Sequence, residues 1–257
     1  MWCNSDDLSE PIITANNQIH SAHRQCDLRL PKTAIVFFMS KGTEYLCKTR
    51  AARELPEAFP RFLNRCPIWE LPDRGICFLD GGRGAPQACD TVETLAALGV
   101  QNVLAVGMFG AFDPRVSLGE ILAPEQAFTE EGTSLHYYET IEFARPDADL
   151  LQTCVSTLQV KSYPIVSTDA VYRQTFRKEA LWREKGAVGV DMETSAVFSV
   201  SAYLGVRSAA ILMASDLHPL RADAPRWDWQ MTTDMRHELA EKSLAAAIRF
   251  ANEQTVL

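Results

Sequence analysis

The sequence predicts an α/β fold built on a parallel sheet. Residues 75–79 form an apolar segment of strand length, and a glycine-rich turn at 80–86 follows it. A helical pattern over 87–98 then leads to a second apolar segment at 103–106, which residues 107–110 end. This order of strand, turn, helix and strand is a βαβ unit, which implies parallel strands joined by a right-handed crossover.

The rest of the chain continues the alternation of strands and helices. Further strands are predicted at residues 34–39, 119–124, 125–128, 163–166 and 209–214, with 119–124 and 125–128 as a pair. Further helices are predicted at residues 40–53, 147–158, 177–185, 191–204 and 232–252. No repeat or linker interrupts residues 31–257, so they are predicted as one domain. Residues 1–30 are predicted as a polar extension that is disordered or lies over the surface.

Composition excludes several classes of function. The 257 residues are 47% hydrophobic and 23% charged, as in an ordinary globular protein. A formal charge of −8 argues against a nucleic-acid partner, which would require a basic face. No apolar stretch has the length of a membrane span and residues 1–29 have no signal-peptide core, so we expect a cytoplasmic protein without a membrane partner. Seven cysteines without a Cys-x-x-Cys pair indicate reduced thiols, and no metal site is predicted.

The most informative stretch is residues 186–205. It places Asp191, Met192 and Glu193 in the first turn of a predicted helix that Gly205 ends. Acidic side chains in a first turn are stabilised by the free backbone N–H groups and by the helix dipole. The two carboxylates are therefore either helix-capping groups or buried acids of a binding site.

Polar groups also follow other predicted strands. Asp216 comes after the apolar segment 209–214, at the strand end where ligands collect in open α/β sheets, although a loop or capping role is the alternative. The turn at 80–86 either exposes N–H groups to an anion or only lets the chain turn tightly. Lys41-Gly42-Thr43 lacks the upstream glycines of a nucleotide phosphate loop. Residues 221–229 are predicted as a lid, a subunit contact or a plain surface loop.

Several motifs, in this order, resemble those of the nucleoside phosphorylases of the purine and uridine type. The turn at 82–86 is similar to that family's Gly-x-Gly-x-Pro, and residues 106–110 are similar to its phosphate loop. Residues 131–134, followed by Tyr137 or Tyr138, resemble its Glu-Gly-Thr-Ser loop. The similar base- and ribose-binding segments are Ser167-Thr168-Asp169 with Tyr172-Arg173, Asp191-Met192-Glu193 and Ser215-Asp216.

The resemblance implies a three-layer αβα sandwich with a central mixed, mostly parallel sheet, assembled as a homo-oligomer such as a dimer or a trimer of dimers. It implies cleavage of the N-glycosidic bond of a nucleoside, with a purine favoured, by inorganic phosphate and without a cofactor. The substrate-binding residues that it implies are Met192, Glu193, Asp191, Tyr172 and Val171. Asp216 would hydrogen-bond to or protonate N7 of the departing purine, as an acid whose pKa is raised in a dry pocket.

The chain departs from the family at the phosphate site. Residues 39–43 stand in place of a Gly-Asp-Pro-x-Arg loop, Met108 replaces a threonine, and Val171 replaces the aromatic side chain that stacks on the base. The residues that would rebuild an anion site are Lys41, Thr43, Arg83, Gly107 and Met108. If Met108 and Phe109 instead close the site, water replaces phosphate, as in the AMP nucleosidases. Binding of a nucleoside or nucleotide without catalysis is the third alternative.

Overall fold

The computed structural model describes residue 7, residues 9–21 and residues 26–253. Within them the strands are β1 Thr33–Phe37, β2 Arg53–Glu54, β3 Ile68–Leu71, β4 Ile76–Asp80, β5 Asn102–Ala111, β6 Ile121–Leu122, β7 Gln126–Glu130, β8 Phe143–Ala144, β9 Pro164–Thr168, β10 Gly189–Asp191 and β11 Arg207–Leu217. The helices are α1 Ala15–Ile19, α2 Gly42–Thr49, α3 Ala85–Ala97, α4 Ala148–Leu158, α5 Phe176–Glu184, α6 Thr194–Tyr203 and α7 Thr233–Glu253.

All the described strands belong to one mixed sheet. Its main path is β2-β3-β4-β1-β5-β10-β9-β7-β8, and β11 pairs with β5 and β6. The ladders β4-β1-β5-β11 and β10-β9-β7 are parallel, whereas β2-β3-β4, β5-β10, β6-β11 and β7-β8 are antiparallel. The predicted α/β class with a mixed, mostly parallel sheet is confirmed.

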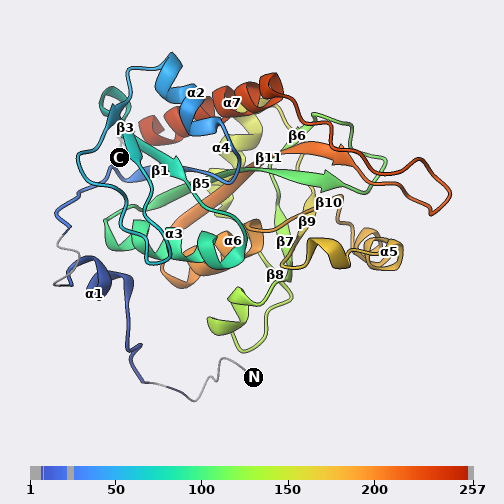
Figure 1. The fold of residues 1–257 in the computed structure, drawn as a ribbon, viewed down its shortest axis with the longest axis horizontal. Helices are drawn as coiled ribbons and strands as arrows, with labels where there is room; N and C mark the ends of the chain where they lie inside the picture. Colours follow the sequence, from blue (N-terminus) through green and yellow to red (C-terminus); the bar gives the residue numbers. More distant parts are fainter. Residues whose placement is uncertain (1–6, 8, 22–25, 254–257) are drawn as a thin grey trace.

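Alternating side chains divide the core between the two faces of the sheet. On β5, Val103 and Ala105 belong to a cluster with residues of α3 and α6, whereas Leu104 and Val106 belong to a cluster with residues of α2, α4 and α7. Figure 1 shows these two groups of helices on opposite faces, so the molecule has three layers. Among the described helices, none is long and apolar enough to cross a membrane.

β5 organises the edge of the sheet where the candidate site lies. It pairs with β1 up to Val106, with β10 at Gly110 and Ala111, and with β11 along its whole length. The strand predicted at 103–106 therefore continues through residues 107–110. The predicted end at Val106 was wrong, because Gly107 to Phe109 hydrogen-bond to β11 as regular strand residues. This change of partner creates a crevice of the kind that binds ligands in α/β proteins.

Other differences from the sequence prediction are local. The strands predicted as a pair over 119–128 do not pair with each other: β6 pairs with β11, and β7 pairs with β8 and β9. The helix predicted to reach residue 53 ends at Thr49, and residues 53–54 form β2 instead. Neither β2 nor β3 was predicted, since both are short and polar or mixed in sequence.

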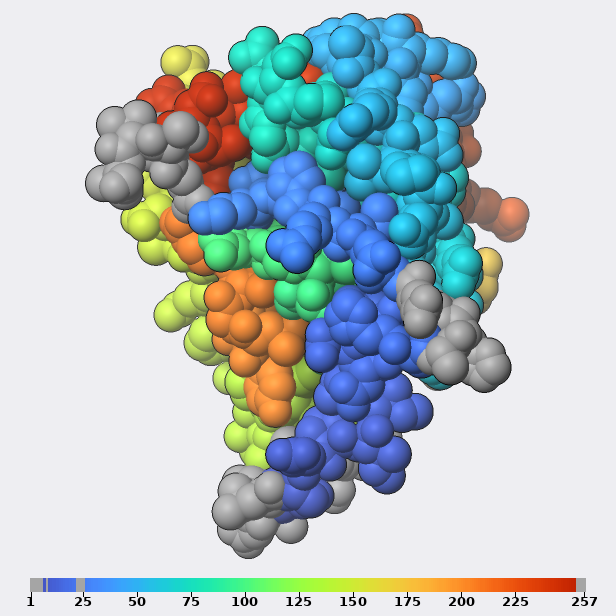
Figure 2. All heavy atoms as spheres, turned by 90° about the vertical axis from the view of Figure 1, so that its left-hand side faces the viewer, coloured from blue at the N-terminus to red at the C-terminus, as the bar shows by residue number. Residues whose placement is uncertain are grey.

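The described part of the N-terminal extension packs against the domain. Thr14 caps α1 by accepting from the backbone N–H of Asn17 at 3.1 Å. Ile19 is completely buried in the core cluster that also contains residues of α3. Figure 2 shows the described part of the N-terminal extension, in dark blue, at the surface of one side of the molecule. Residues 1–6, 8 and 22–25 of the extension lie outside the described residues.

Candidate active site

A cavity of about 720 Å³ lies at the carboxyl ends of β5, β10 and β11. The predicted site residues that line it are Arg83, Met108, Val171, Tyr172, Asp191, Met192, Glu193 and Asp216. Lys41 and Gly107 do not line it: Lys41 is an exposed residue at the start of α2, and Gly107 is buried in β5. The structure thus gathers the predicted ribose and base residues, together with part of the predicted anion site.

Asp191 caps helix α6. It ends β10, and its Oδ2 accepts from the backbone N–H of Thr194 at 3.1 Å, while Ser167 Oγ donates to Oδ1 at 2.5 Å. Because α6 begins only at Thr194, the acids precede the helix rather than lie in its first turn. Burial raises the pKa of Asp191, and the hydrogen bonds from Ser167 and Thr194 offset part of this rise. Asp191 thus makes a capping hydrogen bond to α6 and is also a buried acid of the cavity lining.

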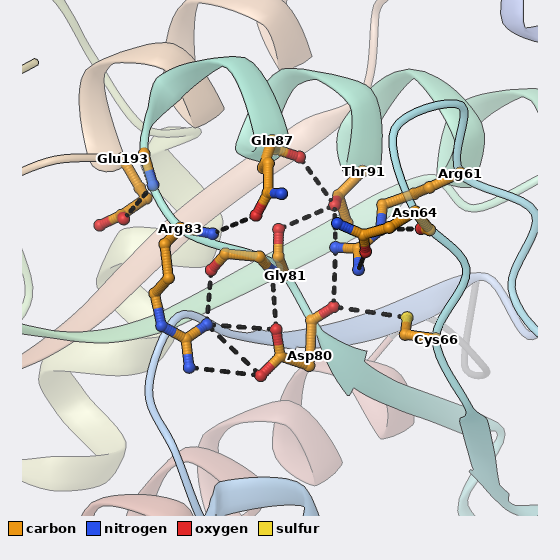
Figure 3. Close-up of polar contacts among 11 residues, drawn as sticks. Arg61, Asn64, Cys66, Asp80, Gly81, Arg83, Gln87, Thr91 and Glu193 are labelled. Carbon is orange, nitrogen blue, oxygen red and sulfur yellow. Dashed lines mark hydrogen bonds and ion pairs between the residues drawn. The ribbon is translucent and has the colours of Figure 1, made fainter.

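Glu193 has a different role from Asp191. Its Oε1 accepts from the backbone N–H of Gly84 at 2.6 Å, which ties the start of α6 to the glycine-rich turn before α3 (Figure 3). Burial raises the pKa of Glu193, and the charge of Asp191 raises it further. Glu193 is therefore a buried acid of the cavity wall. The hydrogen bond from Gly84 engages its Oε1 and not its Oε2.

The glycine-rich turn holds Arg83 in an ion pair. The Arg83 guanidinium lies 3.1 Å from Oδ1 of Asp80, and it also donates to the carbonyl oxygen of Gly82 at 2.5 Å. Asp80 in turn accepts from the backbone N–H of Gly82 at 2.8 Å, and Gln87 accepts from that of Arg83 at 2.7 Å (Figure 3). Gly82 and Gly84 have φ of +83° and +80°, so the turn requires glycine there.

Arg61 supports the same turn from the side opposite Arg83. This buried side chain donates to the Asp80 carbonyl oxygen and to Thr91 Oγ1, each at 3.0 Å (Figure 3). Thr91 Oγ1 itself donates to the carbonyl oxygen of Gly81 at 2.9 Å. The turn is therefore fixed by hydrogen bonds from side chains of its own neighbourhood.

Asp216 lies in the cavity wall with only 3% of its surface exposed. A bulge in β11 between Ala214 and Asp216 sets its position. Ser215 Oγ donates to Oδ1 at 2.5 Å, and Trp227 Nε1 donates to Oδ2 at 2.5 Å. Burial by itself raises the pKa of Asp216, but hydrogen bonds from His218, Ser215 and Trp227 outweigh it and lower the pKa. The expected raised pKa of this acid was wrong, because the dry pocket also holds donors.

His218 was missed by the sequence reading. Its Nε2 lies 3.2 Å from Oδ2 of Asp216, and its Nδ1 lies 2.7 Å from Oε1 of Glu179 in α5. Burial by itself lowers the pKa of His218, but the two carboxylates outweigh it and raise the pKa to about 9. The signal was its place two residues after Asp216, just beyond the end of β11, where its backbone N–H still bonds to the carbonyl oxygen of Ala111 on β5. Nothing in the sequence pointed to Glu179, which comes from a separate helix.

Aromatic and apolar side chains form the mouth of the cavity. Tyr172 is 95% exposed, and Val171 is about half exposed. Trp227 and Trp229, in the loop before α7, lie with ring centroids 6.4 Å apart and line the same cavity. Large apolar surfaces around a polar floor are typical of sites for flat, partly apolar ligands.

Comparison with known proteins decides the family. A family model described as the phosphorylase superfamily matches residues 33–250, which include all the described strands and the whole cavity lining. The chain belongs to the phosphorylase superfamily. Membership confirms the resemblance found in the motifs. In this chain several of those motifs lie at the carboxyl ends of β5, β10 and β11, around the cavity.

Individual members of the phosphorylase superfamily are similar over part of the chain. A guanosine phosphorylase of Halorubrum lacusprofundi is 33% identical over 145 residues, 54% of this chain and 59% of the relative. The match thus spans less than two thirds of that relative's length. A DeoD-type purine nucleoside phosphorylase of Shewanella oneidensis is 27% identical over 68% of this chain and 76% of its own.

A solved structure supports the fold. The AMP nucleosidase of Bacteroides thetaiotaomicron aligns with a TM-score of 0.71 at 17% identity, covering 89% of this chain and 91% of that one. At this identity the likeness extends to the fold alone. Enzymes named as phosphorylases and one named as a nucleosidase are thus both similar to this superfamily member.

Proposed function

We propose that this protein cleaves the N-glycosidic bond of a purine nucleoside and that water, rather than phosphate, attacks the ribose carbon. The observation that favours water is the ion pair between Arg83 and Asp80, with Nη1 3.1 Å from Oδ1. Among the described residues, Arg83 is the guanidinium that lines the cavity, and its charge is already offset by a carboxylate. A phosphate dianion would have to compete with Asp80 for it.

The remaining charges of the cavity favour the same reaction. Its acidic lining residues are Glu179, Asp191, Glu193 and Asp216, against Arg83 and His218 as cations. Cleavage of an N-glycosidic bond passes through a sugar with oxocarbenium character, which is positively charged. An ionised carboxylate, such as that of Asp216 with its lowered pKa, stabilises developing positive charge and repels an incoming anion. Neutral water is the nucleophile that such a lining accepts most readily.

Glu193 and Met192 are the residues proposed to hold the ribose. Glu193 is fixed by the Gly84 N–H through Oε1, which leaves Oε2 to accept a ribose hydroxyl. Both side chains line the cavity on the segment between β10 and α6. A clamped sugar lowers the barrier because its geometry is set before the bond breaks.

Asp216 is proposed to act on the departing base. A purine can accept a proton at N7, and Asp216 lies on the cavity wall beside the aromatic mouth where a base would stack. Val171, Tyr172 and the two tryptophans would cover the faces of the base in place of a single stacking ring.

Phosphorolysis to ribose 1-phosphate is the second candidate. The names of the similar guanosine and purine nucleoside phosphorylases favour it. In this chain phosphorolysis requires a cation for the phosphate, so either Arg83 leaves Asp80 or Lys41 turns toward the cavity.

Product analysis separates the two candidates. Purine and pyrimidine nucleosides and AMP are incubated with the protein, each with and without inorganic phosphate, and the base and sugar products are identified. Release of a purine with free ribose, independent of phosphate, is the expected result. Ribose 1-phosphate formed only with phosphate would replace hydrolysis by phosphorolysis, and no release from any substrate would reject both in favour of binding alone.

A further inference from the structure

His218 lies between two buried carboxylates from different parts of the fold. Its Nδ1 is 2.7 Å from Oε1 of Glu179 on α5, and its Nε2 is 3.2 Å from Oδ2 of Asp216 on β11. Glu179 and Asp216 are the charged groups that face its ring, and all three residues line the cavity. The three side chains form a continuous hydrogen-bonded path from α5 to the proposed leaving-group acid.

The fold builds a specific place for this imidazole. The backbone N–H of His218 donates to the carbonyl oxygen of Ala111 at 2.7 Å, which fixes the chain just beyond β11. The ring lies over Gly110, where a Cβ would stand 2.4 Å from Nε2 and 3.2 Å from Oδ2 of Asp216. A side chain at position 110 would therefore displace the imidazole or the carboxylate.

We propose that His218 is the proton source for the departing base and that Asp216 passes the proton on. This role rests on the proposed cleavage of a purine nucleoside. As the bond between the ribose carbon and N9 breaks, its electron pair moves onto the base. N7 takes a proton from Asp216, and Asp216 takes the Nε2 proton of the imidazolium. Neutral His218, still bonded to Glu179, regains a proton from solvent.

The protonation states of the three groups agree with this path. The pKa of Asp216 is lowered, so the carboxyl group is ionised at neutral pH and has no proton of its own to give. The pKa of His218 is raised to about 9, so the imidazole carries a proton at neutral pH. A carboxylate between an imidazolium and a base nitrogen is a suitable relay, since it can accept from one and donate to the other.

The direct test compares His218→Gln with wild type on two substrates. One is a purine nucleoside that the wild type cleaves, and the other is its N7-methyl derivative, whose base leaves without protonation. General acid catalysis contributes on the order of 100-fold or more. We expect kcat to fall about 100-fold on the plain nucleoside and by less than about threefold on the N7-methyl derivative. His237→Gln, on helix α7 and outside the cavity lining, is the matched control.

Equal losses on both substrates would overturn the relay, because they would indicate a structural or binding role. If the wild type releases no base from either substrate, the proposed function fails and the relay fails with it. If the wild type is active but His218→Gln loses the same factor of kcat on both substrates, only the relay fails and the proposed function stands.

Two further measurements do not depend on the folding of the glutamine variant at position 218. Glu179→Gln removes one of the two carboxylates that face His218, so the alkaline limb of kcat against pH is expected to move to lower pH. In the wild type, the imidazole resonances of His218, assigned by ¹⁵N NMR, are expected to show a doubly protonated ring at neutral pH. An unmoved limb, or a neutral ring at that pH, would overturn the proposal.

Discussion

The indole N–H of Trp227 donates to Oδ2 of Asp216 at 2.5 Å. Trp227 belongs to the loop between β11 and α7, which Figure 1 shows as a long excursion at the edge of the molecule. His218 Nε2 faces the same oxygen, so this carboxylate oxygen already has two partners. A purine that approaches Asp216 must take the place of the indole.

The first prediction concerns the competition between the Trp227 indole and a purine base for Asp216. Trp227→Phe keeps an aromatic ring in the mouth and removes the donor. A hydrogen bond contributes about 1 kcal/mol net, so the KM for the nucleoside is expected to fall by roughly three- to tenfold. Steady-state kinetics measure it, with Trp229→Phe as the control, since no hydrogen bond joins Trp229 to Asp216 in the structure described. A rise in KM would mean that the indole N–H of Trp227 contributes to binding of the nucleoside rather than competing with the base.

The second prediction concerns Asp216 itself. Asp216→Asn keeps the size of the side chain and an acceptor for Ser215, but it cannot relay a proton. We expect kcat to fall by about 100-fold or more while KM changes little, because the ribose contacts lie at Glu193. The control is Asp149→Asn, at an exposed position in α4 whose carboxylate lies 3.4 Å from Arg207. Unchanged turnover in the Asp216 variant would remove this residue from the reaction.

The third prediction concerns the ion pair of the glycine-rich turn. Asp80→Asn removes the charge that offsets Arg83, while the amide oxygen can still accept from the Gly82 N–H. We expect saturable binding of inorganic phosphate to the variant and none to the wild type, measured by isothermal titration calorimetry. Asp113→Asn breaks a similar ion pair with Arg115, 2.8 Å long and away from the cavity lining, and should bind no phosphate. Phosphate binding to the wild type would favour phosphorolysis instead.

The fourth prediction links pH to the stability of the fold through Glu193. Burial, and then the charge of Asp191, raise the pKa of Glu193, so the native state binds its proton more tightly than the unfolded chain does. Its contribution to stability is complete below the ordinary carboxyl pKa of 4.5 and is lost as the pH rises through the raised value. Glu193→Gln, which still accepts from Gly84, is therefore expected to gain stability relative to wild type as the pH rises.

Urea unfolding at about pH 5 and about pH 8.5 measures this difference, which is expected to be larger at the higher pH. Glu193→Ala is the contrasting variant. It leaves the Gly84 N–H without its partner and should cost about 1–3 kcal/mol relative to the glutamine variant at either pH. Both variants should raise KM, because the carboxylate proposed to accept ribose hydroxyls is gone. A difference between wild type and glutamine variant that does not change with pH would contradict the raised pKa.

The core of the fold could be read from the sequence because its signals are local. The segments that became β1, β4, β9 and β11 are apolar and of strand length, and the helical pattern of α3 lies between β4 and β5. Short polar strands such as β2 carry no such pattern. The end of β5 was misplaced for a related reason: glycine favours turns locally, but pairing with β11 keeps residues 107–110 extended.

The sequence by itself determined the α/β class, the family resemblance and the residues at the strand ends, since each depends on residue types at fixed spacing. Only the tertiary structure decided what those residues do. It gave Asp191 a capping hydrogen bond to α6, tied Glu193 to Gly84, paired Arg83 with Asp80, and placed His218 between Glu179 and Asp216. Charge and pKa depend on distance in space, and packing brings together groups that the chain keeps far apart.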